Sequence, residues 1–242
     1  MVFDNADLTG GAQLAGDTFR CQVCAARMSC LLGQLPLPSQ THLATVNREQ
    51  IFKKGQVLLE EGVVSDSIRI IKLGTVMATR RGPDGVARPV AMLGRGQVLG
   101  QYGVFGRTTQ VGAVALSTGR VCEVSVADLR RLNALDSHFI DALHLVMANA
   151  FGRLADWAHI MRLRGLPRQL VATLLLLGAE QGNRVVRLPS HVALAALLST
   201  SRESVARTLR QLEAGGQLRR IDRWHCELTA SHHTLFDDSP SA

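Results

Sequence analysis

The sequence is poor in aromatic residues and in charge. Phe, Trp and Tyr make up 4% of its 242 residues, and Asp, Glu, Lys and Arg together make up 19%. Proteins that hold single-stranded nucleic acid stack its bases on aromatic side chains, so this scarcity argues against that mode of binding. The hydrophobic share is 46%, which is enough to bury a core made mainly of Leu, Val, Ala and Ile.

Long apolar runs and a secretory signal are missing too. No stretch of about 18 apolar residues occurs, so we expect no membrane span. Residues 1–20 lack a basic start followed by an apolar run, so we expect no signal peptide. The expected location is the cytoplasm, where thiols stay reduced. The five cysteines are therefore interpreted as ligands or free thiols rather than as disulfide partners.

The signatures of an enzyme are also missing. The sequence contains no nucleophile–base set, no HExxH metal motif and no P-loop. Gly94-Arg95-Gly96 is not followed by a helical pattern, so it indicates a β-turn rather than a dinucleotide-binding loop. We expect no catalytic activity.

Positive charge is what the chain has in excess. Lys and Arg number 27 against 20 Asp and Glu, which gives a formal net charge of +7. The C-terminal third holds many of the arginines: Arg162, Arg164, Arg168, Arg202, Arg207, Arg210, Arg219, Arg220 and Arg223. A basic surface attracts polyanions, of which nucleic acid is the commonest, so this third predicts contact with double-stranded DNA.

The chain from about Ile51 to Val126 has the pattern of short strands separated by glycines. We expect strands at 56–59, 67–72, 75–79, 90–93, 111–116 and 120–124. Many short strands with frequent turns indicate a sandwich or barrel. Gly82-Pro83-Asp84-Gly85 predicts a hairpin turn, because Pro presets φ and Gly tolerates positive φ.

From about Ala127 the apolar spacing becomes helical. One row repeats every seventh residue at Ile140, Met147, Leu154 and Met161, and a neighbouring row holds Leu143, Ala150 and Trp157. This a/d pattern predicts a long helix that pairs with a second copy of the chain through these residues. The alternative is one long helix that packs only on its own domain. Gly165-Leu166-Pro167 should end the helix.

Residues 190–214 have the pattern of two short helices joined by a tight polar turn, which is a helix-turn-helix. Val205, Leu209 and Leu212 mark the inner face of the second helix. Its start supplies the candidate DNA-binding residues Ser201, Arg202, Glu203, Ser204 and Arg207. Arginine can pair with guanine and glutamate with cytosine. Alternatively, Glu203 completes a capping box with Thr200, and the arginines are simply solvated.

Residues 218–228 have the pattern of a β-hairpin wing beyond that helix. Arg219 and Arg220, together with Arg223, are expected to contact phosphates, which adds affinity and salt dependence rather than sequence choice.

Three cysteines lie close together near the N-terminus. Cys21, Cys24 and Cys30 follow a Cx2Cx5C spacing, and Cys122 stands on an expected strand. Four thiolates can hold an iron–sulfur cluster or a zinc ion, so these four are candidate metal ligands. A thiol–disulfide switch and inert cysteines are the alternatives. Cys226 has no partner by spacing, and we interpret it as a free thiol partly buried in the wing.

A β domain, a long helix and a winged helix-turn-helix with the string Arg202-Glu203-Ser204-Val205-Ala206-Arg207 resemble the CRP/FNR family of bacterial regulators over about residues 20–230. The resemblance implies an α+β fold: an N-terminal β-roll (a cyclic-nucleotide-binding-like jelly roll), a long dimerisation helix and a C-terminal winged helix-turn-helix. It also implies a homodimer that binds palindromic, TGA-containing DNA and contacts RNA polymerase. The expected division is a flexible arm at 1–20, the cysteine segment and β-roll at 21–136, the dimerisation helix at 137–165, the DNA-binding domain at 166–232 and a flexible tail at 233–242.

The cysteine set resembles that of the FNR branch, whose four cysteines ligate a [4Fe–4S] cluster that oxygen destroys. The resemblance implies that Cys21, Cys24, Cys30 and Cys122 hold such a cluster and that the protein senses oxygen. The branch has an acidic residue in the middle of its dimer helix, where this chain has Leu154, so we expect a dimer that persists without the cluster. A zinc-stabilised DNA-binding protein and a nitric-oxide or haem-based regulator are the alternatives.

Residues in two further regions separate this chain from its relatives. Cyclic-nucleotide-binding relatives hold the ribose with a Gly-Glu pair and the phosphate with an Arg-Ser pair, whereas this chain has Gln101 and Thr109-Gln110, so we expect no cyclic-nucleotide binding. The FNR branch has an apolar residue and a serine where this chain has Arg202 and Ala206. Its recognition helix is therefore closer to the cyclic-AMP receptor pattern and favours a TGTGA-type over a TTGAT-type half-site.

Overall fold

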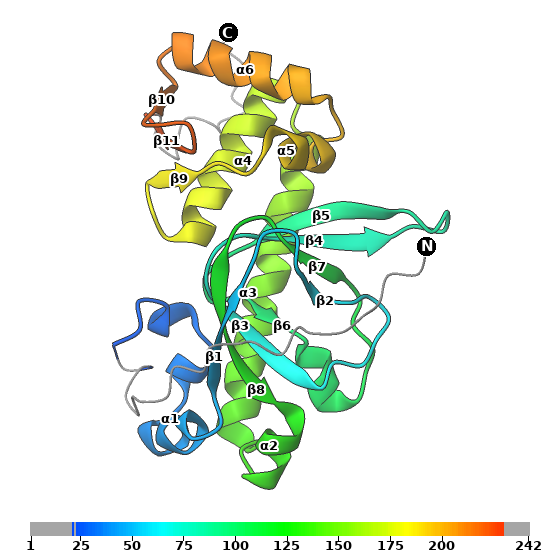
Figure 1. Cartoon of the computed structure of the whole chain (residues 1–242), viewed down its shortest axis with the longest axis vertical. Helices are drawn as coiled ribbons and strands as arrows, with labels where there is room; N and C mark the ends of the chain where they lie inside the picture. The colour runs from blue at the N-terminus through cyan, green and yellow to red at the C-terminus, as the bar shows by residue number, and fades with distance from the viewer. Residues whose placement is uncertain (1–20, 22, 230–242) are drawn as a thin grey trace, which may run out of the picture.

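The computed structural model of the chain describes residues 21 and 23–229. The arm predicted at 1–20 and the tail predicted at 233–242 lie outside the described residues. A β-roll occupies one end of the molecule and a smaller, mainly helical domain the other, and one long helix runs along both (Figure 1). This is the α+β architecture expected from the sequence.

Two antiparallel four-stranded sheets form the β-roll, with strand orders β1-β8-β3-β6 and β2-β7-β4-β5. The strands are β1 (Arg48–Phe52), β2 (Val57–Leu59), β3 (Ser67–Leu73), β4 (Val76–Arg81), β5 (Ala87–Leu93), β6 (Val98–Leu99), β7 (Gly112–Ala115) and β8 (Gly119–Ser125). The predicted hairpin turn is present between β4 and β5, where Gly82 N donates to Val86 O at 3.0 Å and Gly85 has φ of 76°.

The sequence pattern predicts neither β1 nor β6. Of the residues in β1 only Phe52 is buried, so the strand shows no apolar alternation. It forms because its backbone pairs with β8, which places it as an edge strand of the sheet. Strand β6 is only two residues long, which is too short to give a periodic signal.

The helices and the small third sheet complete the fold. The helical elements are η1 (Arg27–Ser29), η2 (Leu32–Gln34), α1 (Leu37–Ala44), η3 (Gln101–Phe105), α2 (Val126–Arg131), α3 (Ser137–Arg162), α4 (Leu166–Gln181), α5 (His191–Leu197) and α6 (Arg202–Ala214). The third sheet has the order β10-β11-β9, from β9 (Val185–Arg187), β10 (Leu218–Arg220) and β11 (His225–Leu228). This is the winged helix-turn-helix predicted from the sequence.

Helix α3 begins and ends where its capping residues require. Asp136 accepts a hydrogen bond from Phe139 N at 2.8 Å, which satisfies one of the amides left free at a helix start. The helix ends at Arg162, because Leu163 is extended. Gly165 then turns the chain with φ of 87°, and Pro167 lies in the first turn of α4, where its missing N–H costs nothing.

Apolar side chains are buried in three clusters. One fills the β-roll between its sheets and includes Phe52 and Val121. Another joins the cysteine segment to β3, β8 and the first half of α3. The last unites the winged helix-turn-helix end with the β-roll, because Met92 packs in the same cluster as Leu170. No helix among the described residues is long and apolar enough to cross a membrane.

Candidate functional sites

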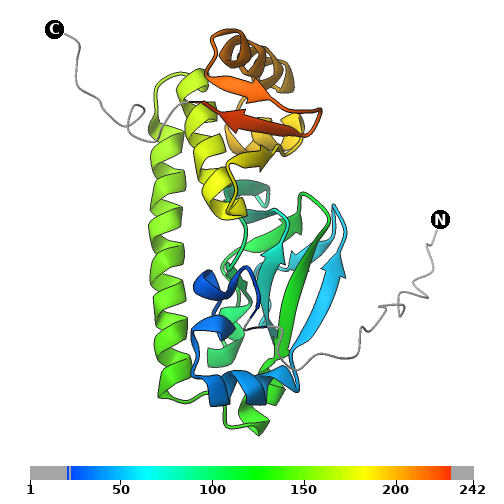
Figure 2. The same cartoon turned by 90° about the vertical axis from the view of Figure 1, so that its left-hand side faces the viewer.

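The candidate cysteine ligands gather in one place although they come from remote parts of the chain. Cys30 is buried, and Cys24 and Cys122 are partly buried against the same apolar cluster. Cys21 lies in the same neighbourhood, close enough that a negative charge on it raises the pKa of both Cys30 and Cys122. Figure 2 shows the cysteine segment, in dark blue, lying beside the β-roll and close to α3.

Short hydrogen-bonded turns bring the N-terminal cysteines round to β8. Cys24 N donates to Cys21 O at 3.4 Å, and Arg27 N donates to Cys24 O at 3.0 Å. The turn is tight enough to need glycine at Gly33, where a Cβ would lie 2.3 Å from Arg27 O. On the other side, Cys122 is held in the middle of β8, paired with both neighbouring strands.

Burial keeps Cys21, Cys30 and Cys122 protonated when nothing binds them. Burial raises the pKa of Cys122 to about 12, and the nearby Cys30 adds to the effect. Burial likewise raises the pKa of Cys30 and of Cys21 above the usual value for a thiol. Metal binding needs thiolates, so loading such a centre releases protons.

Cys21, Cys24, Cys30 and Cys122 are not arranged as a preformed single-ion site. Among residues 21 and 23–229, no three His, Cys, Asp or Glu side chains stand close enough to hold a metal ion. One zinc ion needs its sulfurs in a tight tetrahedron at about 2.3 Å. An iron–sulfur cluster is several atoms across, so its thiolates lie farther apart. The nearest carboxylates are already engaged, Glu49 with Lys72 and Glu123 with Arg69.

The predicted recognition helix is α6. Val205, Leu209 and Leu212 are buried on its inner face, as the sequence predicts. Arg202, Glu203 and Arg207 are exposed on its outer side. Figure 1 places α6 at the end of the molecule farthest from the β-roll, where it is free to meet a large partner.

Serine, rather than threonine, caps this helix. Ser201 Oγ accepts from Ser204 N at 3.1 Å and donates to Ser204 Oγ at 3.0 Å. The capping box suggested for Thr200 and Glu203 is therefore absent, because the cap lies one residue later. The Glu203 carboxylate stays exposed near the helix start.

The charged side chains of the wing have different interaction partners. Arg219 forms an ion pair with Glu227 across the hairpin, so that part of its charge is already neutralised. Arg220 is exposed, and Arg223 lies over the Trp224 ring with its guanidinium carbon 4.8 Å from the ring centroid. Cys226 is fully buried rather than partly buried, because β11 directs it into the domain core.

The predicted dimer-interface residues of α3 divide between two faces. Leu143 and Trp157 are buried inside their own protomer, with 0% and 1% of their surface exposed, so they have no surface to offer a partner. We therefore remove these two from the predicted interface. Leu154 and Met161 are exposed, and Ile140, Met147 and Ala150 are half-buried.

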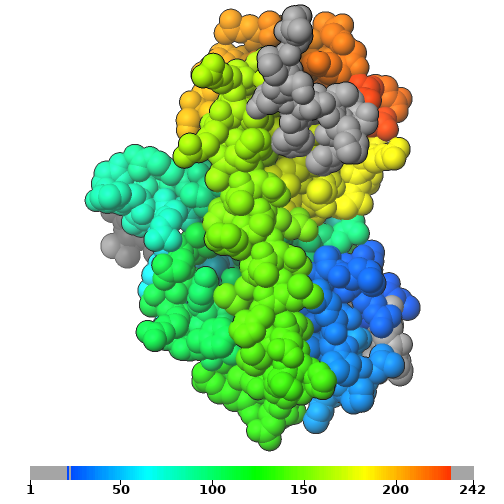
Figure 3. Space-filling model, turned by 180° about the vertical axis from the view of Figure 1, so that it is seen from behind, coloured from blue at the N-terminus to red at the C-terminus, as the bar shows by residue number. Residues whose placement is uncertain are grey.

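Phe151 is the most exposed large apolar residue on this helix, and the heptad pattern does not include it. Its side chain is 75% exposed. An α-helix has 3.6 residues per turn, whereas a seven-residue repeat assumes 3.5. Over several turns the exposed stripe therefore drifts away from a strict seven-residue repeat. Counting at three- and four-residue steps from Leu154 would have found it. Figure 3 shows α3, in light green, running down the middle of one whole face of the molecule.

A buried ion pair joins the two ends of the molecule, and nothing in the sequence pattern indicates it. Glu180 lies near the end of α4 with its side chain fully buried, and it pairs with Arg153 of α3. Its Oε2 accepts from Gly94 N at 3.0 Å, in the turn between β5 and β6. Gly94 is required there, because a Cβ would lie 2.4 Å from Glu180 O. Burial raises the pKa of Glu180, although Arg153 opposes the shift.

Arg95, in the same turn, contacts both the cysteine segment and α4. Its Nη2 donates to Gln181 O at 2.6 Å, and its Nη1 donates to Ala25 O at 3.4 Å. The next residue, Gly96, touches the cysteine segment too, because a Cβ there would lie 2.5 Å from Ser29 Oγ. One turn of the β-roll thus links the candidate metal centre to the winged helix-turn-helix domain.

The positions that would hold a cyclic nucleotide are used otherwise. Gln101 begins η3 directly after Gly100. Thr109 is 2% exposed, and its hydroxyl donates to Glu60 O. Thr109 therefore offers no free donor to a phosphate.

Two protein families match the sequence. The family described as "Cyclic nucleotide-binding domain" matches residues 49–135, and that described as "Crp-like helix-turn-helix domain" matches residues 168–229. Among curated proteins, no sequence matches the chain.

Solved structures of similar fold include several bacterial regulators. FixK2 from Bradyrhizobium japonicum has a TM-score of 0.65 at 20% identity and covers 76% of this chain and 93% of its own. CLP from Xanthomonas campestris, described as a c-di-GMP responsive global regulator, has a TM-score of 0.61 at 18% identity over 81% and 100% of the two chains. A CRP/FNR family transcriptional regulator from Thermus thermophilus has a TM-score of 0.57 at 21% identity over 76% and 94%.

Proposed function

From the premise that this chain is a DNA-binding transcription regulator of the CRP/FNR family, we propose that it senses oxygen through a [4Fe–4S] cluster and binds palindromic, TGA-containing sites as a homodimer. The family is one of transcription regulators and not of enzymes. The proposal adds to that premise a sensory centre, a mode of assembly and a type of DNA site.

The observation that carries the proposal is the convergence of Cys21, Cys24, Cys30 and Cys122. Three come from turns near the N-terminus and one from the middle of a β-sheet, yet all four influence or pack against one another. Four thiols brought together from two remote stretches of chain are readily explained by a centre that thiolates ligate. These four residues would hold the cluster. The cluster would supply a redox-sensitive group that reacts with oxygen and is destroyed by it.

The chain offers a physical route from that centre to DNA. The segment from Cys21 to Cys30 contacts Arg95 through Ala25, and Arg95 contacts Gln181 at the end of α4. Helix α4 packs in the same core cluster as α6, through Leu174 and Leu209. An ordered cysteine segment would therefore favour one position of the DNA-binding domain, and a loosened segment would favour others.

The exposed face of α3 supports pairing of two copies. Phe151, Leu154 and Met161 lie exposed along it, and a long helix with an apolar stripe is stable in water when that stripe is covered. Because Leu154 is uncharged, loss of the centre would leave the stripe intact. Oxygen would then act on DNA affinity rather than on assembly.

Two copies would place two α6 helices one helical turn of DNA apart, as a palindrome requires. Arg202, Glu203 and Arg207 would read base edges, and Arg220 would contact phosphate. Arg202 and Ala206 favour a TGTGA-type half-site. Contact with RNA polymerase and the absence of a cyclic-nucleotide effector are parts of the same proposal.

Anaerobic purification of the wild type, Cys24→Ala and Cys226→Ala tests the sensory centre. We expect about four iron and four sulfide per wild-type chain, and a broad visible band that air bleaches. Cys24→Ala should lose iron and band together. Cys226→Ala is the matched control and should keep both, because Cys226 is buried in the other domain. Zinc without iron, a haem spectrum, or full iron retention in Cys24→Ala would contradict the proposal.

A further inference from the structure

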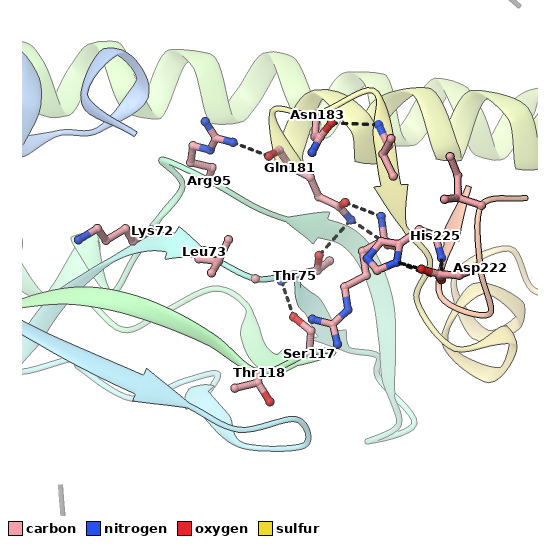
Figure 4. A pocket seen from close by; sticks show the side chains of 14 residues that line it. Lys72, Leu73, Thr75, Arg95, Ser117, Thr118, Gln181, Asn183, Asp222 and His225 are labelled. Carbon is pink, nitrogen blue, oxygen red and sulfur yellow. Dashed lines mark hydrogen bonds and ion pairs between the residues drawn. The ribbon is translucent and has the colours of Figure 1, made fainter. Parts of the chain in front are cut away.

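A second site lies between the β-roll and the DNA-binding domain. It is a cavity of about 430 Å³. The β-roll lines it with Lys72, Arg95 and Thr118, and the DNA-binding domain lines it with Asn183, Arg187 and His225. Figure 4 shows Lys72 and Thr118 on one side of this space and Asn183 and His225 on the other. Its size is within the range of pockets that bind small metabolites.

Positive charge predominates around the cavity. Arg187 is exposed, and its guanidinium makes no hydrogen bond or ion pair within the described chain. Arg95 donates to backbone carbonyls, which satisfy its N–H groups without neutralising its charge. Lys72, by contrast, already forms an ion pair with the Glu49 carboxylate at 2.7 Å.

Among the described residues, Asp222 is the one acidic residue that lines the cavity, and its carboxylate is held by other groups of the chain rather than facing a ligand. Asp222 accepts from Trp224 N at 2.6 Å and pairs with His225 Nδ1 at 2.8 Å. These hydrogen bonds hold its pKa below the ordinary value, and they direct its oxygens into the wing turn.

Two uncharged polar residues of the cavity, Ser117 and Asn183, have an acceptor atom in use and donors left over. Ser117 Oγ accepts from Thr75 N at 3.0 Å, which leaves its O–H to donate. Asn183 Oδ1 accepts from Val185 N at 3.0 Å, which leaves its amide N–H groups. Gln181, by contrast, is satisfied at both ends by the backbone of Arg187. A wall rich in donors and cations and poor in acceptors suits an oxyanion.

We propose that this cavity binds a small, multiply charged oxyanion, a phosphate- or carboxylate-bearing metabolite, which acts as a second effector. Arg187 and Arg95 supply charge from the two sides, and Ser117, Thr118 and Asn183 donate hydrogen bonds. Because the ligand contacts both domains, its binding favours one relative position of them and so changes DNA affinity. The inference goes beyond the proposed function and does not rest on it.

Calorimetric titration of the full chain tests this site without DNA. The probes are pyrophosphate and citrate, each at constant ionic strength adjusted with chloride. We expect saturable binding of one probe per chain. Arg187→Gln should weaken it about tenfold or more, because a charge-assisted hydrogen bond is lost. Thr118→Val should weaken it less, and Arg107→Gln, an exposed cation outside the cavity, should leave it unchanged.

The outcomes separate the two sources of oxyanion. Binding of pyrophosphate alone assigns a phosphate ligand, binding of citrate alone assigns a carboxylate, and either supports the site. No saturable binding of either probe overturns the proposal, as does equal binding to wild type and Arg187→Gln. Thermal unfolding of each variant checks that the fold is retained, and iron content is irrelevant to the result.

Discussion

The arginines of the DNA-binding domain differ in what each can still do. Arg207 is exposed on the outer side of α6, where a side chain enters the major groove. Arg219 is already paired with Glu227, whereas Arg220, beside it, is exposed. Proximity in sequence therefore hides a difference in availability, and we expect α6 to select the site and the wing to add affinity through Arg220 more than through Arg219.

Replacing Arg207 and Arg220 separately should distinguish base reading from phosphate contact. Arg207→Ala should cost about 1–3 kcal/mol on a palindromic TGTGA site and little on random DNA. Arg220→Ala should weaken binding to both and lower the salt slope by about one. Fluorescence anisotropy across a salt series measures both effects. If Arg207→Ala weakened random DNA as much as the palindrome, Arg207 would be a phosphate contact.

Helix α3 has two apolar faces with different tasks. Phe139, Leu143 and Trp157 face inward and belong to the cores of the two domains. Phe151 and Leu154 face outward. A single heptad frame mixes these faces, which is why the sequence pattern assigns Leu143 and Trp157 to the interface. The inward face makes the helix part of each domain, so a partner on the outward face would contact both.

Phe151→Glu should convert a dimer into a monomer without unfolding the chain. The side chain is 75% exposed and belongs to none of the buried clusters, so only an interface would be affected. Two charges would face each other across the pair of helices, without partners. Light scattering after size exclusion measures the mass. Asn149→Glu, exposed on the opposite side of the helix, is the control. A Phe151→Glu protein that stayed dimeric would place the interface elsewhere.

At the scale of the whole molecule, the turn between β5 and β6 connects the cysteine segment with the winged helix-turn-helix end. It touches the cysteine segment through Arg95 and Gly96, and it touches α4 through Gly94 and Glu180. Arg153 of α3 pairs with the same carboxylate. A buried pair is a poor source of net stability but a strong positional constraint, because separating its partners leaves a charge buried without a partner.

Glu180→Gln should therefore weaken coupling more than it weakens folding. The amide keeps the shape of the side chain but loses the charge that holds Arg153. We expect the ratio of DNA affinities with and without the metal centre to fall toward one from a starting value of about 5 to 150. Anaerobic and air-exposed binding assays measure this ratio. Asp156→Asn, an exposed carboxylate on α3, is the control, and an unchanged ratio in Glu180→Gln would show that the signal travels another way.

Local patterns in the sequence determined much of this protein. Glycine-punctuated runs specify the β-roll strands, since strand and turn preferences act over a few residues. The spacing of Val205, Leu209 and Leu212 specifies α6, and the cysteine spacing marks candidate ligands. Each of these signals concerns residues that are neighbours in the chain.

Only the tertiary structure decided which remote residues meet. It placed Cys122 beside the N-terminal cysteines, buried Trp157 in its own protomer and left Phe151 outside. It also paired Glu180 with Arg153 and opened a cationic cavity between the domains. These features depend on how layers pack, and a periodic pattern can show that a helix has an apolar stripe without showing which neighbour covers it.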